Sequence, residues 1–248
     1  MSKMFLQTII YEITYTILSN LFIFFESLFN LWVYLKRKFV DFCHAYAISN
    51  DYEYVLRHSQ KLNKLPTHLT VLLGTENPSY QDLANLVVWS CAAGIPFISF
   101  YDHKGILKKT ETKLQEAVKK KKPDCCHVIW HDSENSYKNG ITGRKIRIRT
   151  LSITDGQKSV ADLTKQLCSY NENKIDQHHI DSLLKDNYVF PDPDLGFYCD
   201  KTFSLYGYPP WQIRTTEFLC FGTHHGVRSH TFLNTLHRYS KTEQRLGK

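Results

Sequence analysis

An arginine and a glycine lie one residue apart near the end of this sequence, in Arg245-Leu246-Gly247-Lys248. Arginine presents a planar, permanently charged fork that binds two phosphate oxygens at once. Glycine has no side chain, so its backbone N–H can approach an anion closely. Arg245 and Gly247 together therefore have the chemistry of a small diphosphate clamp. Because a chain end is more often a frayed segment, this interpretation depends on the rest of the sequence.

Other groups of residues that could carry chemistry have unfavourable spacing. Cys125-Cys126-His127 with His131 contains zinc-ligand types, but adjacent cysteines fit one tetrahedral site poorly, and no second pair completes it. The adjacent pairs His178-His179 and His224-His225 are poor joint metal ligands, since neighbouring rings tend to point apart. No dinucleotide or P-loop glycine motif and no GxSxG nucleophile elbow is present. Apart from the tail, the sequence shows no evident catalytic machinery.

Composition bounds the class of protein. The 248 residues are 42% hydrophobic and carry a formal charge of +7, enough for one core with an appendage. The charge is concentrated in Lys119–Lys122, which indicates a helix end before Pro123, and in the alternating strand pattern Arg144–Arg149. Neither segment has the stacking aromatics of a nucleic-acid module. Seven cysteines without repeating spacing argue against a disulfide scaffold and favour buried thiols in a reducing compartment.

The first 38 residues form a hydrophobic segment in which membrane anchoring is expected. Residues 4–35 contain only two charges, and Lys36-Arg37-Lys38 follows at once. A helix crossing a membrane and a helix lying in the interface both remain open. The weakly polar stripe carries acids rather than the lysines typical of interfacial helices, which slightly favours crossing, with the following domain in the cytosol. A cleaved signal peptide is less consistent with the sequence, because no small-residue cleavage site follows the apolar run. A soluble amphipathic helix docked on its own domain is a further alternative. The stripe consists of Thr8, Glu12, Thr16, Ser19, Glu26 and Asn30.

Strand and helix patterns alternate after a polar connector, residues 39–65. Ser79 and Asp82 have the spacing of a capping box, and Gly94 is suited to end the helix that they open. The alternation predicts an α/β domain with a mostly parallel central sheet flanked by helices on both faces. Strands are predicted at 69–73, 96–101, 126–130, 145–151 and 217–221, and helices at 79–94, 159–170, 178–186 and 230–242.

Three blocks of sequence resemble the Nogo-B receptor family, the non-catalytic partner subunits of the eukaryotic cis-prenyltransferase that makes dehydrodolichyl diphosphate. They are LVVWSCAAGIPFISFYDHKGILKK at Leu86–Lys109, PDPDLGF at Pro191–Phe197 with PWQIRTTEF at Pro210–Phe218, and the terminal EQRLGK. The resemblance covers residues 66–248 and implies a cis-prenyltransferase or undecaprenyl diphosphate synthase-like domain over that range. The hydrophobic segment 1–38 matches only in general character.

The same resemblance implies that this chain's own site is inactive. Catalytic relatives place Asp-Gly-Asn after the first strand, and that aspartate holds Mg²⁺; here Gly74-Thr75-Glu76 follows Pro66-Thr67-His68 and its strand. A glycine supplies no carboxylate ligand. Where catalytic relatives carry two arginines that bind isopentenyl diphosphate, an ungapped match puts Tyr198 and Ser204. One alternative is a stand-alone homodimeric synthase in which Glu76 takes over metal binding.

The resemblance also gives the tail a role. In this family the terminal Arg-x-Gly crosses to the catalytic partner, so Arg245 and the Gly247 backbone N–H would bind diphosphate in the partner's Mg²⁺-dependent site. The implied function is an accessory but essential subunit of a heteromeric cis-prenyltransferase for dolichol synthesis and protein glycosylation. It would lie at the endoplasmic reticulum membrane and act on farnesyl and isopentenyl diphosphate through the complex. The alternative is a membrane-anchored receptor or binding protein with a catalytically dead fold.

Overall fold

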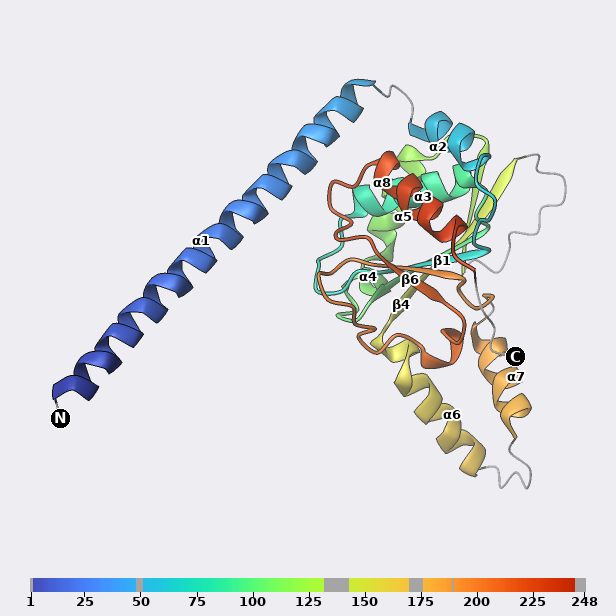
Figure 1. Cartoon of the computed structure of the whole chain (residues 1–248). Coiled ribbons are helices and arrows are strands. Elements are labelled where there is room, and N and C mark those ends of the chain that lie inside the picture. The colour runs from blue at the N-terminus through green and yellow to red at the C-terminus, as the bar shows by residue number, and fades with distance from the viewer. Residues whose placement is uncertain (1, 48–50, 132–142, 170–175, 189, 244–248) are drawn as a thin grey trace. The chain divides into compact units, whose positions relative to one another are not determined.

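Six parallel strands form the central sheet of this protein, described here as a computed structural model (Figure 1). The structure describes residues 2–47, 51–131, 143–169, 176–188 and 190–243. The strand order is β3-β4-β2-β1-β5-β6, and all five pairings are parallel. This confirms the predicted fold class. The strands are β1 (His68–Leu72), β2 (Phe97–Asp102), β3 (Cys126–Trp130), β4 (Arg144–Ser152), β5 (Leu195–Tyr198) and β6 (Glu217–Cys220).

The two faces of the sheet are covered differently. Helices α2, α3, α5 and α8 gather on one side (Figure 1), over a core that includes Val71, Phe100 and Phe197. Tyr101 and Leu151 point to the opposite face, where Phe190 and the segment 205–213 pack on them. The sheet is thus flanked by helices, as predicted. The helices are α2 (Asp51–Ser59), α3 (Tyr80–Ala93), α4 (Ile106–Lys109), α5 (Glu111–Lys121), α6 (Gln157–Ser169), α7 (Gln177–Tyr188) and α8 (Ser229–Ser240), with 3₁₀ turns η1 (Ile153–Asp155) and η2 (Pro210–Gln212).

Helix α3 shows which capping signals in the sequence were reliable. Gly94 adopts the left-handed conformation with φ 87°, and its N–H donates to the carbonyl of Cys91, as predicted for a helix-ending glycine. At the other end, Ser79 precedes the helix as expected, but its hydroxyl donates to Asp82 Oδ2 at 2.6 Å. The predicted capping box is therefore wrong in detail, because the two side chains bond each other instead of the backbone.

The chain divides into two compact units, Met1–Ser49 and Asn50–Lys248. The first consists of helix α1 (Ser2–Ala47), which continues past the predicted boundary at residue 38. Residues 51–59, predicted as connector, form α2 within the second unit, where Val55 is fully buried and Asp51 accepts a 2.8 Å hydrogen bond from Ser229. The unit boundary thus differs from the predicted connector at 39–65, because Val55 and its neighbours supply apolar contacts that a connector would lack.

Helix α1 exposes most of its large apolar side chains, with exposed fractions between 44% and 72%. Within the part of the chain that the structure describes, no helix combines the length and the apolar character that a membrane crossing requires.

Two cysteines pair in the structure, which corrects the expectation of buried thiols alone. Cys91 of α3 and Cys126 of β3 form a disulfide with a Cα–Cα distance of 6.4 Å. Both residues are buried in the core. Since Cys126 is engaged with Cys91, the zinc site considered for Cys125-Cys126-His127 is not formed around it.

Candidate functional site

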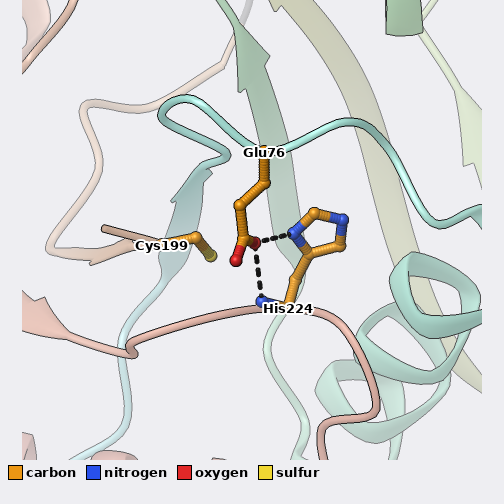
Figure 2. Close-up of side chains that lie close together, drawn as sticks. All are labelled: Glu76, Cys199 and His224. Atoms are coloured by element: carbon orange, nitrogen blue, oxygen red, sulfur yellow. Dashed lines mark hydrogen bonds and ion pairs between the residues drawn. The ribbon is translucent and has the colours of Figure 1, made fainter. Parts of the chain in front are cut away.

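The carboxyl ends of β1, β5 and β6 lie side by side because these strands are neighbours in a parallel sheet. This edge is the usual place for ligand sites in α/β folds. The segments that follow the three strands bring together Glu76, Cys199 and His224, as Figure 2 shows. One ligand-type atom of each residue lies within 4.8 Å of those of the other two. This cluster is the candidate site of the described chain.

Glu76 and His224 form a close, buried hydrogen-bonded pair. Glu76 Oε2 accepts from His224 Nδ1 at 2.6 Å and from the His224 backbone N–H at 3.1 Å. The imidazole is fully buried and the Glu76 side chain is 20% exposed. Burial alone raises the pKa of a carboxyl, but the hydrogen bonds from His224 and Thr223 outweigh it and hold the pKa of Glu76 below its usual value. Glu76 is therefore an ionised acceptor in the folded protein.

The second ring nitrogen of His224 fixes the tautomer. Nε2 accepts the backbone N–H of Ser79 at 3.0 Å. A neutral imidazole has one N–H and one lone pair, so Nδ1–H donation to Glu76 and Nε2 acceptance from Ser79 use the whole ring. A metal bound at Nδ1 would move the proton to Nε2, opposite the Ser79 N–H. Two donors would then face each other in a buried site, at the cost of two lost hydrogen bonds.

The remaining member of the cluster is also poorly suited to a metal. Burial, with the neighbouring carboxylate of Glu76, raises the pKa of the Cys199 thiol well above its usual value. Mg²⁺ prefers oxygen ligands in octahedral geometry, and this cluster offers one carboxylate that already accepts hydrogen bonds from His224 and Thr223. The residues present do not fit the Mg²⁺ that the fold family implies at this position. We therefore describe the cluster as a hydrogen-bonded lock between Glu76 and His224.

The lock extends to the start of α3. Asp82 Oδ2 accepts from the Ser79 hydroxyl at 2.6 Å and from the Gly226 N–H at 3.1 Å. The loop between β1 and α3 and the segment between β6 and α8 are thus joined at two points. These segments are far apart in the sequence, so the hydrogen bonds hold together two loops at the carboxyl ends of the strands.

The YDHKG block is also explained by structure. The buried Asp102 accepts from the backbone N–H groups of Lys104 and Leu107, each at 2.9 Å. The Lys104 ammonium reaches the Thr75 carbonyl at 2.7 Å. This block therefore ties the end of β2 to the loop that contains Glu76.

The Pro-x-His and PDPDLGF blocks meet at the opposite edge of the sheet. His68 Nδ1 lies 2.6 Å from the Pro191 carbonyl and Nε2 lies 2.9 Å from the Ser99 hydroxyl. Asp194 Oδ2 accepts the backbone N–H of Thr67 at 2.6 Å. Burial lowers the pKa of His68 to about 4, so this histidine is neutral in the folded protein. Asp194 thus joins the start of β1 to the segment before β5.

The predicted tail residues Arg245 and Gly247 lie outside the described residues. Tyr198 ends β5 and contacts Phe203, and Ser204 accepts a weak hydrogen bond from the Tyr206 N–H at 3.4 Å. Neither position supplies a cation.

The rings of His224 and His225 lie 4.2 Å apart, so the expectation that they point apart is wrong. Glu76 was considered from sequence as a metal ligand, whereas its pairing with His224 was missed.

Searches against known proteins assign the family. No family model matches the chain. A Mus musculus protein, dehydrodolichyl diphosphate synthase complex subunit Nus1, is 32% identical over 205 residues, which cover 76% of this chain and 68% of the mouse protein. The Homo sapiens subunit of the same name is 31% identical over 203 residues, covering 76% and 69%. The Schizosaccharomyces pombe subunit is 26% identical over 234 residues, covering 87% and 90%.

Solved structures agree at the level of fold. A probable undecaprenyl diphosphate synthase from Campylobacter jejuni aligns with a TM-score of 0.53 at 14% identity, over 75% of this chain and 100% of that one. Lavandulyl diphosphate synthase from Lavandula x intermedia aligns with a TM-score of 0.50 at 14% identity, over 74% and 98%. Together with the sequence relatives, these findings confirm the resemblance drawn from the motifs, and the chain belongs to the Nus1 family of dehydrodolichyl diphosphate synthase complex subunits.

Proposed function

We propose that this chain is the accessory subunit of a heteromeric cis-prenyltransferase that makes dehydrodolichyl diphosphate for dolichol synthesis and protein glycosylation. The observation that carries the proposal is the lock between Glu76 and His224. In a chain with this family's sequence and this fold, the position of the metal-binding loop is used for an internal hydrogen-bond network. The chain therefore contributes to prenyl transfer through a partner that has its own intact site.

The proposed contribution to chemistry comes from the tail. Arg245 would bind oxygens of the diphosphate in the partner's site, and the Gly247 N–H would donate to the same group. Mg²⁺ bound in the partner would stabilise the negative charge on the departing diphosphate. Helix α8 ends at Ser240, five residues before Arg245, and the segment that precedes α8 is held by the hydrogen bonds of the lock. A rigid α8 would give the tail a fixed starting point on the domain.

The proposed contribution to localisation comes from α1. This helix carries large exposed apolar side chains along its described length, among them Ile13, Phe22 and Trp32. Exposed apolar surface of this extent is typical of a membrane or partner contact. We place the complex at the endoplasmic reticulum membrane, with the α/β domain facing the cytosol.

A reconstitution of prenyl elongation tests the proposal. Farnesyl diphosphate, isopentenyl diphosphate and Mg²⁺ are supplied to this chain alone, to the catalytic partner alone, and to both. Product is expected to form at full rate only in the mixture. Product from this chain alone would revive the stand-alone synthase, and partner activity that is indifferent to this chain would favour the receptor alternative.

The variant Arg245→Ala separates the tail from assembly. Losing one fixed donor to a developing anion costs about 10²–10³ in rate, so turnover of the complex should fall by that factor. Co-purification with the partner should be unchanged. Lys241→Ala removes a nearby cation at the end of α8 and serves as the charge control. Equal activity of Arg245→Ala and Lys241→Ala would contradict the assigned role of Arg245.

A further inference from the structure

A groove lies between helix α5 and the edge strand β3, which is at the other end of the strand order from β5 and β6. Its volume is about 490 Å³, within the range of ligand sites. β3 is the first strand in the sheet order, so the groove follows an edge of the sheet. The lining consists of Thr112, Gln115, Glu116, Val118, Lys119, Lys122, Val128 and Trp130.

The groove has an apolar floor and a basic rim. Val128 and Trp130 alternate along β3 and are only partly buried, and Val118 of α5 completes the floor. Lys119 lies in the last turn of α5, and Lys122 directly follows the helix in an extended conformation; both line the groove. Within the described part of the chain, neither lysine takes part in an ion pair of 4 Å or less. An apolar surface beside two available ammonium groups suits an amphiphile with an anionic head.

Lys121, the last residue of α5, has a different role from Lys119 and Lys122. Lys121 donates to the Gln81 carbonyl at 3.1 Å and to Asn85 Oδ1 at 2.7 Å, so it has a structural role. Cations near the end of a helix also complement its dipole, which accounts for lysines on this turn but not for the tryptophan and valine beside them. The one carboxylate of the lining, Glu116, is one turn from Lys113 and Lys120 on the same helix, so the groove retains a positive balance.

We propose that this groove binds an anionic phospholipid of the bilayer, with its phosphate between Lys119 and Lys122 and the start of an acyl chain over Val128 and Trp130. Basic residues near a membrane surface attract anionic lipids, and tryptophan suits the boundary between head groups and acyl chains. The inference rests on the proposed membrane attachment, because a chain held at a bilayer meets lipid head groups continuously. The groove then sets one face of the domain against the membrane.

The test uses quenching of Trp130 fluorescence by lipids brominated near the head of the acyl chain. The full chain carries four tryptophans, and Trp32→Phe removes the one in α1. The difference between this protein and its Trp130→Phe derivative isolates the Trp130 signal. In vesicles, brominated phosphatidylglycerol is expected to quench that signal at least about two-fold more than brominated phosphatidylcholine.

Two lysine pairs give a matched comparison. Lys119→Gln with Lys122→Gln should abolish the preference for the anionic lipid. Lys158→Gln with Lys165→Gln removes the same charge from the exposed face of α6 and should leave the preference intact. Equal quenching by both lipids, or an equal effect of both lysine pairs, would overturn the groove as a specific site.

A soluble arm separates this inference from the membrane attachment itself. A short-chain brominated phosphatidylglycerol below its micelle concentration should quench Trp130 without any bilayer, and inorganic phosphate should not compete, since it lacks the acyl chain. If the short-chain lipid quenches Trp130 in a protein that does not attach to vesicles, the proposed membrane attachment is wrong and the lipid site in the groove is supported. If the protein attaches to vesicles but Trp130 is not quenched, only the proposed lipid site in the groove is wrong.

Discussion

His68 is a buried base, and its ionisation is linked to folding. Its pKa is about 4 in the folded protein and about 6.5 in an unfolded chain. Between these values the unfolded chain binds the additional proton, so protonation favours unfolding. The stability that neutral His68 confers is complete above pH 6.5 and is lost as the pH falls toward 4. At about 1.36 kcal/mol per pKa unit, the loss amounts to about 3 kcal/mol.

Urea unfolding of the full chain at pH 7 and pH 4.5 measures this loss. His68→Gln keeps a donor and an acceptor toward Pro191 and Ser99 but does not titrate in this range. The difference in unfolding free energy between the two pH values should therefore be about 2–3 kcal/mol smaller in the variant. The same pH dependence in both proteins would show that His68 is not the group responsible.

Glu76 is expected to contribute to stability and not to metal binding. Glu76→Ala leaves the His224 Nδ1–H and backbone N–H without their acceptor. An unsatisfied buried donor costs about 1–3 kcal/mol, so the variant should lose about 2–4 kcal/mol of unfolding free energy. Glu53→Ala, which breaks only an exposed pair with Arg57, should change it by less than about 0.5 kcal/mol.

Addition of Zn²⁺ separates a lock from a metal site. A site that binds metal only in the folded state raises the unfolding midpoint with metal concentration. We expect no such rise, because the Ser79 N–H holds His224 in the tautomer that lacks a free lone pair. A Zn²⁺-dependent rise that disappears in His224→Gln would contradict the lock.

The sequence identifies single residues with useful chemistry, but it does not show which distant residues they contact in the fold. Glu76 attracted attention because of its place after the first strand, and it is indeed central. Its partner His224 is 148 residues away, on a segment whose position depends on the pairing of β5 with β6. No local pattern records such a contact. For the same reason no sequence pattern showed that the Asp194 carboxylate accepts the Thr67 N–H at the start of β1.

Gly196 determines how β5 and β6 pack at the scale of elements. A Cβ at this position would lie inside the van der Waals radius of the Phe218 ring in the neighbouring strand. Gly196→Ala should therefore lower the unfolding free energy by about 1–3 kcal/mol through overpacking. Adding Phe218→Leu should restore part of the loss, and the double-mutant cycle measures this coupling. Additive effects would mean that the two residues do not touch.

Elements with strong local signals were predicted within a few residues. Strand β3 was predicted at its observed bounds, and α3 ends at the glycine assigned to end it. Strand β5 was not predicted, because it has four residues, one of them glycine, and follows a proline-rich turn. Helix α2 was absorbed into a polar connector, since a nine-residue helix with mean polar character gives little periodic signal. Packing against α3 and α8, not propensity, stabilises it.

The whole molecule combines an α/β unit with a helix that has no comparable core of its own. The two compact units meet at residues 49 and 50, whereas the sequence analysis placed a connector at 39–65. The division suggests that attachment and catalytic support are separable. A chain lacking residues 1–49 should still raise the elongation rate of the partner in detergent, whereas the same chain without residues 245–248 should not.

Vesicle flotation of the full chain tests attachment directly. Phe22, Phe25 and Phe29 lie on one face of α1 and are each more than half exposed. Burying a phenylalanine in an apolar phase contributes about 1.5–3 kcal/mol, so replacing all three with serine should weaken partitioning by about 10³-fold or more. Ile106, Ile153 and Phe203 are exposed in the second unit, and their triple serine variant is the matched control. If the control variant loses flotation to the same extent, nonspecific apolar contacts over the whole surface would explain vesicle binding. If only the α1 variant loses flotation, α1 is the membrane anchor.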